Sequence, residues 1–274
     1  MPRLFDYDAS RASLFKPCKP PFFNGWQPSA DASLCAELAR LAYCEGDSVQ
    51  NALPAVSFRL VDEIHEPSGD GTYVFLAEGE RTAVLAFRGT QPDDPTDIFD
   101  DARFLPVEWA AGGNVHAGFA DALQRVWRDV QQLLGKTTRP VIVTGHSLGA
   151  ALATLAASLV APRLLVTFGS PRVGDAAFCE SLSRTVEAKR YVDCCDIVCQ
   201  IPPPLPYQHV GSLHYIDRDG EVQLDPPEWV MAGDQLAGHA DYVRNYVWRP
   251  GTNASRSLAD HTPMNYVSAI AGVP

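Results

Sequence analysis

One serine lies in a sequence context that predicts nucleophilic chemistry. Ser147 is the centre of the pentapeptide GHSLG at 145–149, after the β-branched run 141–144 and before the alanine-rich segment 148–160. This order predicts a strand, a sharp turn and a helix, the arrangement called a nucleophile elbow. The flanking glycines leave room where strand and helix approach, and free N–H groups at the start of the helix can stabilise a negative oxygen. The motif therefore predicts that Ser147 attacks a carbonyl carbon.

A serine nucleophile of this kind needs a base and an orienting acid, which are expected on loops after later strands. Asp196 lies where the chain leaves the predicted strand 188–193, whereas Asp193 is close enough to that strand to be a strand-end residue. Of the later histidines, His261 precedes a Thr-Pro helix start, and His239 lies in a helix-like run. The pattern favours Asp196 as the acid and His261 as the base, with Asp193 and His239 as alternatives.

The overall composition limits the possible partners. The chain has 274 residues, of which 46% are hydrophobic, and a formal net charge of −11. These values fit one α/β domain, 1–274, with a sizeable core. An acidic chain without a basic patch is a poor match for nucleic acid, so a neutral substrate is expected. The longest apolar run, 149–168, is interrupted by Pro162 and Arg163, which predicts helix, turn and strand and no stable membrane insertion.

The cysteines predict a reduced protein. There are seven, at positions 18, 35, 44, 179, 194, 195 and 199. An odd number without CxxC spacing leaves at least one thiol unpaired and offers no metal-ligand pattern. Because the N-terminus lacks the apolar stretch of a signal peptide, we expect buried thiols, no obligatory disulfide and a cytoplasmic location. Secretion is the alternative if a leader has been removed.

The remaining segments predict a mostly parallel sheet flanked by helices. Residues 1–30, rich in proline and aromatic residues, are expected to form an extended arm whose rings pack on the core. Three closely spaced strands suggest an antiparallel start to the sheet, and the later alternation of strand and helix is typical of parallel βαβ units. In chain order, the predicted elements are 31–44 (helix), 56–64, 72–77 and 82–87 (strands), 119–134 (helix), 140–144 (strand), 148–160 (helix), 164–169 (strand), 175–186 (helix) and 188–193 (strand).

Several motifs, in order along the chain, resemble one family. They are FRGT at 87–90, VHAGF at 115–119, TGHSLGAA at 144–151, FGSPRVGD at 168–175, and DIV at 196–198 followed by IPP at 201–203. Together they are similar to lipase class 3, the filamentous-fungal type, from about residue 31 to the C-terminus. The resemblance implies an α/β-hydrolase fold and a serine carboxylic-ester hydrolase without a cofactor, most simply a triacylglycerol lipase. Phospholipase A1 and feruloyl-type esterase are the alternatives within the family, and a catalytically silent binding protein is the alternative of another class.

The resemblance also implies roles for individual residues. Thr90 corresponds to one oxyanion donor, and the backbone N–H of Leu148 to the other. The acid corresponds to Asp196 and the base to His261. In the family a tyrosine follows the histidine, and Tyr266 corresponds to it. The spacing between the histidine and the tyrosine is wider here than in the fungal members.

The same resemblance implies a lid over residues 92–110. In the fungal enzymes a short amphipathic helix covers the site at this place. Here apolar residues recur at helical spacing, with acidic residues on the opposite side. We expect this stripe to cover the site in water and to open at a neutral lipid–water interface. The stripe consists of Ile98, Phe99, Ala102 and Leu105.

Overall fold

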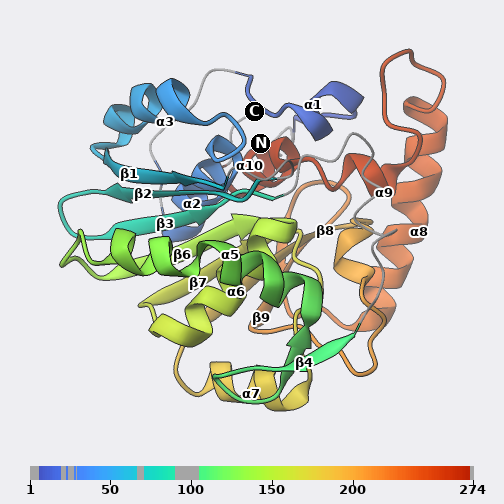
Figure 1. The fold of residues 1–274 in the computed structure, drawn as a ribbon. Coiled ribbons are helices and arrows are strands. Elements are labelled where there is room, and N and C mark those ends of the chain that lie inside the picture. Colours follow the sequence, from blue (N-terminus) through green and yellow to red (C-terminus); the bar gives the residue numbers. More distant parts are fainter. Residues whose placement is uncertain are drawn as a thin grey trace.

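An eight-stranded sheet forms the centre of the molecule (Figure 1). A computed structural model describes residues 6–19, 23, 28, 30–66, 71–89 and 105–271. The strand order is β1-β2-β3-β6-β7-β8-β9-β10. The strands are β1 (Arg59–His65), β2 (Tyr73–Glu78), β3 (Ala83–Phe87), β6 (Val141–His146), β7 (Leu164–Phe168), β8 (Ala188–Asp193), β9 (Ser212–Ile216) and β10 (Val222–Leu224).

The direction of the strands follows the predicted pattern. β1, β2 and β3 are antiparallel neighbours, whereas β3, β6, β7, β8 and β9 run parallel, and β10 returns antiparallel beside β9. The predicted antiparallel start and parallel continuation are therefore confirmed. In the parallel part, Phe87 is paired with Gly145, and Phe168 with both His146 and Tyr191. This register brings the residues that follow β3, β6, β7 and β8 to one edge of the sheet.

Helices cover both faces of the sheet, because β2, β3 and β7 are almost wholly apolar and need burial on both sides. Figure 1 shows α3 and α10 on one side and α5, α6 and α7 on the other. The predicted long helices are confirmed within a few residues at each end. The helices on the two faces are α2 (Asp31–Leu41), α3 (Gly46–Ala52) and α10 (Pro263–Ala271), and α5 (Ala117–Leu134), α6 (Leu148–Val160) and α7 (Ala176–Ser183).

Each face has its own core. On one side, Leu123, Val126 and Val130 of α5 are buried with residues of α6 and α7, and Phe119 and Leu134 are half-buried against them. On the other side, Leu34, Leu38 and Leu41 of α2 pack with residues of α10 and the sheet. Within the described part of the chain, no helix is both long enough and apolar enough to cross a bilayer.

The N-terminal arm differs from its prediction. Residues 11–15 form a short helix, α1 (Arg11–Phe15), so the arm is not extended throughout. Tyr7 reaches the C-terminal region, where its hydroxyl donates to Asp260 Oδ1 over 2.6 Å. Phe23 is buried in the core of the α2 face, as expected for an aromatic residue of the arm.

The end of the predicted lid segment belongs to the body of the protein. Residues 90–104, which include Ile98, Phe99 and Ala102, lie outside the described residues. Leu105 is 58% exposed and is not helical, and a two-stranded ribbon of β4 (Pro106–Glu108) and β5 (Asn114–His116) begins directly after it. Trp109 is buried, and its Nε1–H donates to Ser158 Oγ of α6 over 2.8 Å. Residues 105–110 are not helical, and Trp109 is buried in the core, whereas the lid expected over residues 92–110 stays a prediction.

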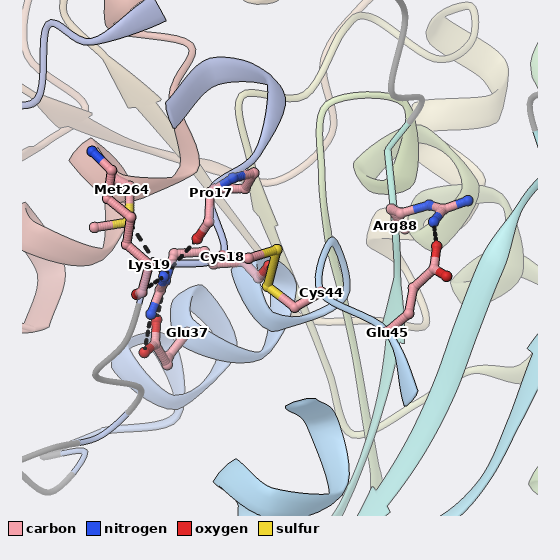
Figure 2. The surroundings of a disulfide bond; sticks show 9 residues. Pro17, Cys18, Lys19, Glu37, Cys44, Glu45, Arg88 and Met264 are labelled. Carbon is pink, nitrogen blue, oxygen red and sulfur yellow. Dashed lines mark hydrogen bonds and ion pairs between the residues drawn. A yellow bond between two sulfur atoms is a disulfide. The ribbon is translucent and has the colours of Figure 1, made fainter. Parts of the chain in front are cut away.

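The expectation of fully reduced cysteines was also wrong. Cys18 of the arm and Cys44, just after α2, form a disulfide (Figure 2). The five remaining cysteines, at positions 35, 179, 194, 195 and 199, are buried and free. Beside the disulfide, Glu45 pairs with Arg88, which directly follows β3 (Figure 2). Pairing of residues 26 positions apart depends on how the arm returns to α2, which local sequence patterns do not encode.

Loss of the Cys18–Cys44 disulfide is expected to lower the melting temperature. A crosslink that closes a loop of this size contributes about 2–4 kcal/mol, which corresponds to roughly 5–10 °C for a protein of this size. A Cys18→Ser, Cys44→Ser variant measured by differential scanning calorimetry tests this. Cys179→Ser, which removes a free buried thiol, is the control. Equal melting temperatures of the double variant and wild type would contradict a stabilising crosslink.

Candidate active site

Ser147 is held on a strained turn between β6 and α6. Its φ of 60° and ψ of −130° lie outside the regions that L-residues prefer, and its N–H donates to Phe168 O over 3.0 Å. Leu148 is the first residue of α6, so its N–H has no acceptor within the helix. A Cβ at Gly149 would lie 2.3 Å from Phe87 O, which explains why glycine is needed where the helix passes β3. The predicted elbow is present in the fold.

His261 lies within hydrogen-bond distance of Ser147 on one side of its ring and of Asp196 on the other. His261 Nε2 lies 2.8 Å from Ser147 Oγ, and His261 Nδ1 lies 2.9 Å from Asp196 Oδ2. All three side chains are buried. A carboxylate accepts hydrogen bonds only, so the geometry fits an imidazole that donates from Nδ1 and accepts the serine hydroxyl at Nε2. The structure thus brings together three residues that are 114 and 65 positions apart in the chain.

Two further donors fix the Asp196 carboxylate. Tyr266 OH donates to Oδ2 over 2.6 Å, and the Val198 N–H donates to Oδ1 over 2.9 Å. Burial and then the nearby Asp196 charge raise the pKa of Tyr266 well above its ordinary value, so the phenol keeps its hydrogen. The Tyr266 oxygen in turn accepts from the Asp193 N–H over 3.1 Å. Asp196 therefore has a defined orientation toward His261.

Gly169, directly after β7, leaves the space that the acid and the base occupy. Its φ is +57°, and a Cβ there would lie 2.8 Å from Asp196 Oδ2 and 3.1 Å from His261 Nδ1. Glycine adopts this backbone conformation without strain, and any side chain would displace the Asp–His pair. Sequence reasoning placed this residue only in a matching motif and gave it no function.

A second histidine, His146, packs its ring against the ring of His261. The rings of His146 and His261 lie 4.6 Å apart, and Tyr43 OH is 2.8 Å from His146 Nδ1. Burial, with a smaller contribution from His261, lowers the pKa of His146 well below its ordinary value, so this ring is neutral. Tyr43 was missed by sequence reasoning because it lies in no motif and comes from the turn just after α2, far from the elbow in the chain.

The chain that leaves β3 passes close to the elbow. A Cβ at Gly89 would lie 2.4 Å from Tyr43 OH and 2.8 Å from His146 O. Gly89 is the last described residue before the gap, and Thr90 lies outside the described residues. The oxyanion role of Thr90 stays a prediction.

The alternative acid and base lie elsewhere. Asp193 is fully buried, and within the described chain its carboxyl oxygens have no hydrogen-bond partner. His239 is exposed on helix α8 (Glu228–Asn245), so its ring is not part of the buried group around Ser147. The geometry therefore favours Asp196 and His261 over these two.

Asp193 is expected to make stability depend on pH. Burial, followed by the charge of Asp260, raises the pKa of the Asp193 carboxyl well above 3.8. The folded protein then keeps a proton that the unfolded chain releases above about pH 4, so this residue lowers stability as pH rises, by about 1.4 kcal/mol per pH unit. Asp193→Asn removes the effect. Its melting temperature relative to wild type should increase steadily from pH 5 to pH 8, and parallel curves would contradict the assignment.

One group of side chains could place three metal-ligand atoms together. Among the described residues, Cys194, Cys195 and Asp260 have potential ligand atoms within 4.8 Å of one another. However, Arg256 Nε already donates to Asp260 Oδ2 over 3.0 Å, and the guanidinium charge would repel a cation. The group is better described as a buried ion pair beside two thiols.

Comparisons with known proteins agree with this geometry. The family model described as lipase (class 3) matches residues 84–205. A secreted mono- and diacylglycerol lipase of Malassezia globosa is 31% identical over 207 residues, which cover 66% of this chain and 67% of that protein. The chain belongs to the class 3 lipase family. A lipase of Rhizopus niveus is 38% identical over 160 residues, which cover 52% of this chain and 39% of that protein. The chain therefore spans well under half the length of that relative.

The fold is likewise that of the family. The solved structure of lipase II from Rhizopus niveus superimposes with a TM-score of 0.57 and 28% identity, and it covers 68% of this chain and 77% of that chain. The α/β-hydrolase fold expected from the sequence is thereby confirmed for this chain. Ser147 and Asp196 both lie inside the matched range, whereas His261 lies beyond it.

Proposed function

We propose that this chain is a serine hydrolase of carboxylic esters whose natural substrates are acylglycerols. One observation carries the proposal: Ser147 Oγ, His261 and Asp196 form a continuous hydrogen-bonded chain of 2.8 and 2.9 Å at a strained elbow. A serine becomes nucleophilic when a base accepts its proton and an acid orients that base.

In the proposed reaction, Ser147 Oγ forms a bond to the ester carbonyl carbon while its proton passes to His261 Nε2. Asp196 stabilises the resulting imidazolium. As the ester C–O bond breaks, His261 returns the proton to the leaving alcohol. Water then attacks the acyl-enzyme by the same route and releases the fatty acid and free Ser147. No step needs a cofactor.

The oxyanion of the tetrahedral intermediate needs donors on the opposite side from His261. The Leu148 N–H at the start of α6 suits this role, since helix N-termini favour negative charge. Thr90 is the proposed second donor, because it directly follows Gly89, whose backbone lies against the elbow.

The substrate class follows from the family. The Malassezia and Rhizopus relatives are named as lipases, the former for mono- and diacylglycerols. We extend lipid-ester hydrolysis to this chain as a proposal, together with the lid expected over residues 92–110.

The location is proposed to be an oxidising compartment. The Cys18–Cys44 disulfide would be reduced in a cytoplasm, and the Malassezia relative is named as secreted. These points replace the cytoplasmic expectation.

A fluorophosphonate probe tests the proposal directly. Wild type should be labelled at Ser147, and peptide mass spectrometry identifies the modified residue. Hydrolysis of a chain-length series of p-nitrophenyl esters, followed by tri-, di- and monoacylglycerols and phosphatidylcholine, then defines the substrate. Absence of labelling would favour a catalytically silent binding protein, and preference for phosphatidylcholine would favour a phospholipase A1.

A further inference from the structure

Helix α8 is built differently from the other long helix of the protein. α5 and α8 both have 18 residues, and α5 buries six of them. α8 buries only Gly238 and Tyr242. Its large apolar residues Trp229 and Leu236 are instead 77% and 74% exposed. Surface helices normally turn their apolar stripe inward, so this exposed stripe calls for a partner.

The exposed apolar and small residues of α8 form one row along the helix, whereas Glu228, His239 and Arg244 are exposed beside it. Trp229, Leu236 and Val243 recur every seven residues, which keeps them within a narrow sector of the helix surface. Small residues fill the positions between them, and a Cβ at Gly233 would contact nothing within 4 Å. We call this set the α8 row: Trp229, Ala232, Gly233, Leu236, Ala240 and Val243.

Two polar residues of α8 face the protein. Asp234 Oδ2 accepts hydrogen bonds from Tyr215 OH over 2.8 Å and from the Arg218 N–H over 3.0 Å. Gln235 Nε2 donates to Cys194 O over 2.9 Å. These contacts fix the orientation of the helix and leave the α8 row on its outer side.

These contacts place α8 at the edge of the sheet that carries the candidate site. Cys194 lies two residues before Asp196, and Gly238 O accepts from Arg256 of α9 (Arg256–Ala259), which precedes His261. Figure 1 shows α8 beside α9 and near the end of β8. Whatever binds the row is therefore held next to the loops that carry the acid and the base.

We propose that the α8 row docks this protein on the surface of a neutral lipid phase. The choice of lipid rests on the proposed function. The row contains no charged side chain. Beside it, Glu228 is acidic and Arg244 is paired with Asp241 over 3.1 Å, so this part of the helix has no excess of positive charge to attract an anionic head group. A net charge of −11 adds repulsion from anionic surfaces at low salt. Tryptophan favours lipid–water boundaries, and Trp229 at the start of α8 and Trp248 just beyond its end are both exposed.

A second copy of the chain is a weaker match. A single ridge of this kind exposes roughly 600 Å² of apolar surface, so a symmetric pair would bury about 1,200 Å², the lower limit for stable complexes. A fluid lipid surface accepts the ridge without needing a complementary shape.

Flotation with vesicles of ether-linked phosphatidylcholine tests the row independently of catalysis, because these lipids have no ester to cleave. Leu236→Asp should lower the partition coefficient at least about tenfold, since one large apolar side chain leaves the lipid. Leu224→Asp, at an exposed leucine of β10 outside the row, is the matched control and should stay within about twofold. Melting temperatures check folding, and Leu236→Ser replaces Leu236→Asp if the latter melts early.

Four outcomes would overturn the inference, three of them in the flotation and sedimentation experiments with neutral lipid or none. These three are no binding of wild type to neutral vesicles, equal losses in Leu236→Asp and Leu224→Asp, or a dimer in sedimentation equilibrium that Leu236→Asp dissociates. Binding that increases with added ether-linked phosphatidylglycerol would also contradict a neutral surface. Fluorophosphonate labelling in solution separates the two proposals: a labelled protein that does not bind vesicles refutes only the row, and an unlabelled protein that binds refutes only the hydrolase.

Discussion

Replacement of Ser147 by alanine is expected to reduce kcat for soluble p-nitrophenyl esters by about 10⁶-fold. Ser147 Oγ is the atom 2.8 Å from His261 Nε2, and without it no acyl-enzyme can form. Because the members of such a group act as a unit, removing His261 as well should add little to the loss. Steady-state rates of Ser147→Ala and of Ser147→Ala, His261→Ala measure this.

The fold should survive this substitution, since alanine is smaller than serine at a buried position. Fluorophosphonate labelling should disappear along with turnover. A Ser147→Ala variant that is still labelled, or that retains more than a small fraction of the rate, would show that another residue is the nucleophile.

Asp196→Asn is expected to lower kcat by roughly 10³–10⁴-fold, whereas Asp193→Asn should change it only a few-fold. The introduced side-chain amide has an NH2 group where the carboxylate has an oxygen. If that NH2 group faces His261 Nδ1, it donates a hydrogen bond there instead of accepting one, so the imidazole is no longer held in the productive tautomer. Asp193 has no such contact with the ring, as its carboxyl oxygens have no hydrogen-bond partner within the described chain. Both substitutions preserve size, so the pair isolates the contact with the base.

The same logic applies to the two histidines. His261→Ala should abolish measurable turnover, and His239→Ala, at an exposed position on α8, should leave soluble-ester hydrolysis within a few-fold of wild type. The reverse ranking in either the acid pair or the base pair would mean that the hydrogen-bonded chain of 2.8 and 2.9 Å is not the reacting group.

Two buried tyrosines make hydrogen bonds to residues around Ser147. Tyr266 of α10 links Asp193 to Asp196, and Tyr43, in the turn after α2, contacts His146 beside His261. Both tyrosines lie on the α2 and α10 side of the sheet, so packing on that side helps to set the orientation of Asp196 and His261. The Cys18–Cys44 disulfide adjoins Tyr43, which connects the N-terminal arm to the same region.

The sequence by itself predicted the elements and the candidate nucleophile. Periodicity of two and of 3.6 residues is a local property, so β6, α6, β7 and β8 were predicted close to their observed bounds. The elbow was predictable for the same reason, because the strand, the glycines that flank Ser147 and the helix are consecutive in the chain. The ordered motifs then identified the family and the expected fold.

The tertiary structure decided which distant residues meet. Asp193 and Asp196 are three residues apart, and only the position of His261, 65 residues after Asp196, distinguishes them. The Cys18–Cys44 pairing and the space at Gly169 likewise depend on contacts between separate segments. For α8, the sequence indicated a helix-like run, but Asp234 faces inward and accepts from Tyr215 and Arg218, while the apolar row lies outside. Local patterns encode the period of a helix, and only its neighbours determine which side they cover.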